Sequence, residues 1–182
     1  MLKKRTSSVV MLVLAAMACT KNDPTFLITE TSVGSISNGT TLNLLEELLP
    51  NDSIVRDTMQ SNVRNTLKKV KIYEKGGMPL MLLTAANDSL KTIENIQVLD
   101  PRFSAENGIS LRSTFKDIQE KYTIKKIVTT LNSLVIFPKE SNLYFTIDKT
   151  ELPYNLRFNQ PNIEAVQIPD EAKIKYLMIG WN

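Results

Sequence analysis

Two stretches of the chain share one pattern of apolar and polar positions. Ile36–Leu49 reads ISNGTTLNLLEELL and Ile109–Tyr122 reads ISLRSTFKDIQEKY, and the two align at an offset of 73 residues. In each stretch a short extended segment and a Ser/Thr start signal precede apolar residues at positions i, i+3 and i+7. The pattern therefore predicts one amphipathic helix in each stretch, over Thr41–Leu49 and Thr114–Tyr122, with Leu45 and Ile118 at equivalent buried positions.

Beyond each helix, short apolar segments that alternate like β-strands recur in the same order. The matched segments are Ile54–Val55 with Ile127–Val128, Ile72–Tyr73 with Ile136–Phe137, Leu80–Leu82 with Leu143–Phe145, and Ile93–Val98 with Ile163–Ile168. Repeated order of this kind indicates an internal duplication. The predicted fold class is therefore α+β, with two similar halves that each hold a helix packed on an antiparallel β-sheet. Two unrelated α+β segments with similar patterning are the alternative.

Turn residues divide the predicted strands. Gly76–Gly77 lies between two apolar runs, which predicts a β-hairpin of Val70–Lys75 and Met78–Thr84. Asp57–Lys69 has apolar residues at helical spacing among mostly polar positions, so we expect a loop or a marginal helix there. Lys173–Trp181 contains a run of three apolar residues and is predicted to be the last strand.

The first 18 residues have the pattern of a bacterial signal peptide. Lys3, Lys4 and Arg5 form a positive end, and Val9–Ala18 is an uncharged apolar run of ten residues, which is too short to span a bilayer as a helix. Ala18–Cys19 follows the pattern of a lipoprotein cleavage site, although Ala16 and Met17 depart from the usual residues before it. We expect cleavage between Ala18 and Cys19, lipidation of Cys19, and anchoring by two or more acyl chains.

Removing this leader changes the charge and sets the expected domain boundaries. The chain carries +3, of which the leader contributes three cations, so the remaining 182 − 18 = 164 residues have a net charge of 3 − 3 = 0. A neutral chain gives no support to nucleic-acid binding. We expect a lipidated N-terminus and short tether at residues 19–25, then one α+β domain at 26–182, with repeats at about 26–101 and 102–182. An Asp directly after the lipidated Cys favours retention in the inner membrane, whereas this chain has Thr20. We therefore expect the protein on the periplasmic face of the outer membrane.

Parts of the chain resemble the RpoE-regulated lipoprotein family of bacterial envelopes. Ile28–Leu42 holds an SVGxI-like turn before the first helix, and Ile93–Tyr122 holds an Ile-x-Val-Leu-Asp segment and a Gly-Ile-x-x-x-Ser-x-Phe lead into the second helix. Arg112 stands where the family pattern leads us to expect Gly. The resemblance covers about half of the chain and implies an envelope location and a shared fold; it brings no catalytic residue.

The residue types present restrict the chemistry. The chain has no His, and its single Cys is assigned to lipid, so His-dependent catalysis, His metal sites and thiol chemistry are excluded. We predict no cofactor, no metal and no enzymatic activity. The favoured function is a membrane-anchored envelope lipoprotein that binds a protein or lipid partner close to the membrane.

The alternative is a carboxylate-dependent hydrolase of envelope glycans, because a pair of carboxylates can cleave a glycoside. The candidate acids are Glu46, Glu47, Asp100, Asp117, Glu120 and Asp170, and the aromatic residues that could line a sugar-binding groove are Tyr144, Tyr176 and Trp181. Helix acids more often form a solvated face, Asp beside Pro more often forms a turn, and strand aromatics more often belong to the core.

Overall fold

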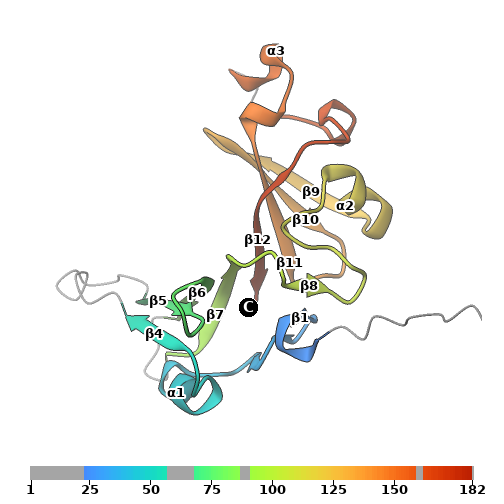
Figure 1. Cartoon of the computed structure of the whole chain (residues 1–182). Coiled ribbons are helices and arrows are strands. Elements are labelled where there is room, and N and C mark those ends of the chain that lie inside the picture. Colours follow the sequence, from blue (N-terminus) through green and yellow to red (C-terminus); the bar gives the residue numbers. More distant parts are fainter. Residues whose placement is uncertain (1–22, 57–67, 87–90, 159–161, 182) are drawn as a thin grey trace, which may run out of the picture.

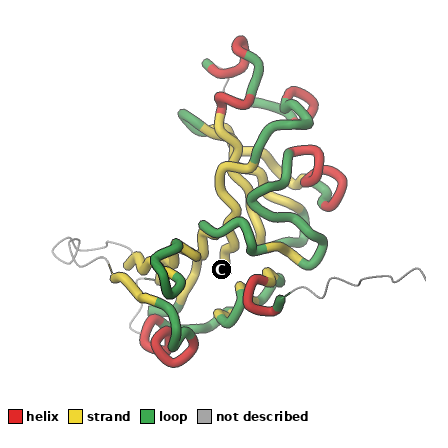
Figure 2. The backbone as a smooth tube through the Cα atoms, viewed as in Figure 1, coloured by secondary structure: helices red, strands yellow, loops and turns green. Residues whose placement is uncertain are grey.

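The computed structural model describes residues 23–56, 68–86, 91–158 and 162–181. In these residues β-strands are the main element, and they form one sheet of eight strands and one of four (Figures 1 and 2).

The larger sheet is entirely antiparallel. Its strands, in chain order, are β4 (Ser53–Arg56), β5 (Lys68–Tyr73), β6 (Pro79–Ala85), β7 (Ile93–Val98), β9 (Ile124–Thr129), β10 (Ser133–Pro138), β11 (Leu143–Asp148) and β12 (Ile174–Gly180). Their order in space is β4-β5-β6-β7-β12-β11-β10-β9. Two four-stranded arms therefore meet where β7 pairs with β12, and they extend from that pair in different directions (Figure 1).

The smaller sheet ties the N-terminal segment to the middle of the chain. It contains β1 (Leu27–Ile28), β2 (Ser32–Val33), β3 (Ile36–Ser37) and β8 (Ser104–Ala105) in the order β3-β2-β1-β8, and β1 and β8 are parallel.

The helices are short. The α-helices are α1 (Leu45–Leu48), α2 (Phe115–Lys121) and α3 (Tyr154–Arg157), and the 3-10 turns are η1 (Pro24–Phe26), η2 (Leu42–Leu44), η3 (Lys149–Glu151) and η4 (Ala165–Gln167). Thr114 caps α2 through a box with Asp117, which confirms the helix predicted there. Thr41 makes no side-chain cap bond, and the helix predicted over Thr41–Leu49 divides into η2 and the four residues of α1.

The predicted fold class, two α+β halves that each hold a helix packed on its own antiparallel sheet, is wrong. The fold is mostly β, because one continuous sheet of eight strands runs through both predicted halves and the helices are only one or two turns long. Leu45 and Ile118 are buried helix positions, as the helical spacing predicts, but most of the core comes from alternating strands.

One predicted strand is also wrong. Ile163–Ile168, the predicted counterpart of Ile93–Val98, contains the 3-10 turn η4, and Val166 is 88% exposed. In the sheet β7 pairs with β6 and with β12, and β12 lies within the predicted last strand Lys173–Trp181. The predicted hairpin around Gly76–Gly77 is confirmed by the pairing of β5 with β6. Most of the Asp57–Lys69 segment lies outside the described residues.

Buried apolar residues from both sheets and from the helices form one core cluster. Leu45, Ile118 and Phe145 are fully buried in it. The inner face of the eight-stranded sheet supplies alternate residues such as Ile72, Leu83 and Ile96 to this core.

The N-terminal segment is fixed to the rest of the fold by several contacts. The Phe26 ring packs edge-on against Phe103, with centroids 5.2 Å apart, and lies beneath the Arg102 guanidinium at 4.2 Å. The Glu30 carboxylate accepts hydrogen bonds from the Ser141 hydroxyl (2.7 Å) and the Asn142 backbone N–H (2.6 Å). The chain that leads into the domain is therefore held against both sheets.

Candidate interaction surface

The side of the eight-stranded sheet that faces away from the core carries a continuous row of cross-strand neighbours. In the six inner strands of the sheet both chain neighbours of the row member are buried, so the row lies on the side opposite the core. The row crosses all eight strands of the sheet. We call this side of the sheet the outer face. From β4 to β9 the row is Val55, Lys71, Leu82, Gln97, Met178, Tyr144, Phe137 and Lys126.

Aromatic and cationic groups occupy one end of the row. The rings of Tyr144 and Phe137 stack with centroids 5.5 Å apart, and the Lys126 ammonium lies 5.0 Å from the Phe137 centroid. The Asn95 amide donates a hydrogen bond to the Tyr144 hydroxyl. Burial raises the pKa of the Tyr144 phenol. This cluster presents a flat apolar surface with polar groups beside it.

The outer face is partly open to solvent. Val55 is 52% exposed, Tyr176 38% and Val128 37%, and Tyr176 and Val128 flank the row through their pairings with Thr146 and Val135. An uncovered sheet face that carries several apolar side chains is typical of an interaction surface.

The three aromatic residues proposed for a groove are separated by the fold. Tyr144 and Tyr176 share the outer face. Trp181 is only 5% exposed and its indole N–H donates to the Glu30 carbonyl oxygen at 3.1 Å, so it belongs to the core. Alternation in the sequence allows an outward Tyr144, and Phe137 lies only one turn away, but Asn95 is 49 residues distant in sequence and cannot be assigned from the pattern.

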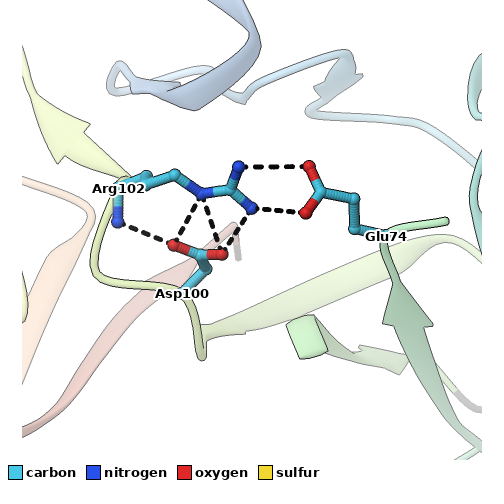
Figure 3. Close-up of polar contacts among 3 residues, drawn as sticks. All are labelled: Glu74, Asp100 and Arg102. Atoms are coloured by element: carbon cyan, nitrogen blue, oxygen red, sulfur yellow. Dashed lines mark hydrogen bonds and ion pairs between the residues drawn. The ribbon is translucent and has the colours of Figure 1, made fainter. Parts of the chain in front are cut away.

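Asp100 is the most deeply buried of the candidate acids, at 3% exposure. Arg102 donates three hydrogen bonds to the Asp100 carboxylate, from its backbone N–H (2.8 Å), Nε (3.1 Å) and Nη2 (2.7 Å). Its Nη1 and Nη2 atoms also donate to the Glu74 carboxylate, at 3.1 and 2.9 Å (Figure 3). These hydrogen bonds lower the pKa of Asp100. A carboxylate held ionised by a guanidinium is poorly suited to act as a general acid, and here it closes the turn after β7.

Three other candidate acids make local contacts, and the remaining two, Glu47 and Glu120, are exposed. Glu46 bonds to Arg56 at 2.5 Å, Asp117 belongs to the cap of α2, and the Asp170 carbonyl accepts from the Lys116 N–H. The structure thus brings none of Glu46, Asp100 and Asp117 together, and each has a local structural partner. In the described ranges no group of three His, Cys, Asp or Glu side chains could hold a metal ion.

Partial burial and the nearby Glu74 raise the pKa of Asp52. The sequence indicates Asp52 only as part of a helix stop, and its proximity to Glu74 follows from the pairing of Ser53 with Tyr73.

Ala18 and Cys19, the predicted cleavage and lipidation residues, lie outside the described residues. Within the described part of the chain, the structure has no helix with the length and apolar character needed to cross a membrane.

The fold has a relative among proteins of known structure. No family model matches the chain, and no curated protein matches it. The fold is similar to a crystal structure of the uncharacterized protein yfeY from Escherichia coli, with a TM-score of 0.51 and 16% sequence identity. The similarity covers 84% of this chain and 98% of that chain. At this identity the likeness shows a shared fold.

Proposed function

We propose that this chain is a non-enzymatic lipoprotein of the bacterial envelope that binds a partner close to the membrane through its outer face. The observation that carries the binding role is the set of apolar and aromatic side chains on the outer face, of which Val55, Val128 and Tyr176 are exposed. We place the chain in the RpoE-regulated lipoprotein family on the residues quoted from Ile28–Leu42 and Ile93–Tyr122. The fold shared with yfeY is compatible with that placement.

The anchor rests on the leader sequence and on Cys19. Asp23, where the described fold begins, is four positions after Cys19, and this length spans at most about 14 Å. Because Phe26 and Glu30 are held against the sheets, an acyl chain on Cys19 would keep the domain next to the bilayer. The location that the sequence favours is the periplasmic face of the outer membrane.

Cys19→Ser tests the anchor. The variant is expected to accumulate as unprocessed precursor or as a soluble form, and to incorporate no labelled palmitate. Retention of palmitate labelling, together with membrane association after an alkaline wash, would show that Cys19 is not the anchor.

Tyr176→Asp tests the binding surface, and Leu131→Asp is the matched control, because Leu131 is 87% exposed in the turn between β9 and β10. Membranes from cells that carry each variant are dissolved in mild detergent, and the size of the extracted species is measured. Wild type and Leu131→Asp should elute in a complex larger than the monomer, whereas Tyr176→Asp should elute as the monomer. Equal sizes for all three would contradict a role for the outer face.

The hydrolase alternative has less support. A glycoside hydrolase needs two carboxylates facing each other across a site, whereas Glu46, Asp100 and Asp117 are engaged by Arg56, Arg102 and the cap of α2.

A further inference from the structure

Two lysines lie near the ends of the row on the outer face. Lys71 on β5 and Lys126 on β9 are separated by six strand spacings in the sheet order, which is about 29 Å measured along the sheet. Leu82, Met178 and the Tyr144–Phe137 pair lie between them. Between these two lysines the row is thus apolar except for Gln97, and Val55 on β4 extends it beyond Lys71.

These lysines have no carboxylate partner in the described chain. Lys71 lies 5.7 Å from the Tyr73 ring and Lys126 lies 5.0 Å from the Phe137 ring, so each makes a cation–π contact. Lys69, which pairs with Thr84 on the same side of β5, adds a third cation. The outward acid of β11, Asp148, is engaged by Lys175 at 2.6 Å. A partner that carries carboxylates would therefore complement the charge of this surface.

We propose that the partner docks on the outer face with an acidic amphipathic segment of a protein. Its apolar side would cover the middle of the row, and carboxylates at its two ends would pair with Lys71 and Lys126. A segment that follows the row from Lys71 to Lys126 needs about nine residues as an extended chain. This inference rests on the proposed function and names the class of partner.

The shape of the sheet favours a protein segment over a membrane surface. The two arms leave the β7–β12 pair in different directions (Figures 1 and 2). A flat bilayer cannot lie along both arms at once, whereas a protein segment can follow the row across the bend.

The test reverses the charge at each end. The full-length lipidated chain is extracted with its partner in mild detergent, and the salt concentration that releases half of the chain is measured. Lys71→Glu and Lys126→Glu should each weaken the complex by about tenfold and lower that salt concentration. Lys116→Glu is the matched control, because Lys116 is an exposed lysine of α2, a helix whose Phe115 and Ile118 are buried in the core.

The outcomes separate this inference from the proposed function. If Tyr176→Asp breaks the complex but both charge reversals leave it unchanged, the outer face binds a partner that is not acidic, and this inference is overturned. If the extracted particle holds phosphatidylglycerol and no second protein, and the reversals release the lipid, the occupant is a lipid and the inference is again overturned. If none of the variants affects the complex, the proposed function fails as well.

Discussion

Gly34 is the position where a single added carbon should disturb the attachment of the N-terminal segment. Its φ is +54°, a left-handed conformation, and a Cβ atom there would lie 2.6 Å from the Thr25 backbone oxygen. The Gly34 N–H also donates to the Leu27 carbonyl at 2.8 Å. Gly34→Ala therefore combines an unfavourable backbone conformation with a clash against main-chain atoms that precede β1.

The two costs can be estimated separately. A left-handed conformation costs an L-residue about 1–2 kcal/mol. Relieving an overpacked contact costs about 1–3 kcal/mol, because Thr25 and η1 would have to move away from Phe103. The sum is about 2–5 kcal/mol, which is a large part of the stability of a typical domain.

Gly39→Ala is the matched control. Its φ is +88°, but no atom lies within 4 Å of the position that a Cβ would take there, so only the conformational cost applies. The free energy of unfolding is measured by urea titration for both variants. Gly34→Ala should be the less stable of the two by about 1–3 kcal/mol, or by about 2–12 °C in Tm. If the two variants are equally stable, the close approach of Gly34 to Thr25 does not exist as described.

Three further predictions concern the core, pH and the anchor. Leu45→Ala and Ile118→Ala each leave a cavity at a fully buried position and should lower the free energy of unfolding by about 2–5 kcal/mol; near-neutral urea midpoints for both would contradict the packing of α1 and α2. The Lys175 ammonium and the Thr150 N–H hold the pKa of Asp148 at about 2. Because this pKa is below the unfolded value of about 3.9, the stabilisation is present above pH ~4 and is lost as the pH falls toward 2. The stability difference between wild type and Asp148→Asn should therefore shrink over that window, and a constant difference would show that the ion pair contributes nothing. A flexible 30-residue linker inserted between Asn22 and Asp23, which keeps Asp23 as the cap of η1, should leave the urea midpoint unchanged. It should reduce complementation of a deletion strain that has an envelope-stress phenotype, because it dilutes the domain at the membrane; full complementation by this form and by Cys19→Ser would make membrane proximity irrelevant.

Local signals in the sequence predict several elements correctly. The alternation around Gly76–Gly77 predicts the β5–β6 hairpin, and the Ser/Thr start followed by apolar residues at helical spacing predicts α2. These features depend on residues close in sequence, whose pattern can be compared directly.

The errors come from interactions that are distant in sequence. The alignment of Ile163–Ile168 with Ile93–Val98 suggests that Ile163–Ile168 is a strand. In the structure the last strand, β12, pairs with β7 instead. The repeated helix pattern suggests that each half is organised around its own helix, but the pairing of β7 with β12 makes one sheet of both segments, and this pairing leaves no local signal. The outer face cannot be predicted from the sequence for the same reason. Val55, Gln97 and Phe137 become members of one row only through the order of the strands in the sheet.

Photo-crosslinking in intact cells can decide whether the outer face is where this protein meets its partner. A photoreactive amino acid is placed in turn at three outer-face positions, Val55, Val128 and Tyr176, and at three exposed apolar positions elsewhere, Leu131, Tyr154 and Val166. We predict that the three outer-face positions yield adducts with the same protein and that the other three do not. Adducts of equal yield from all six positions, or adducts from Leu131, Tyr154 and Val166 alone, would show that the partner does not bind at the outer face.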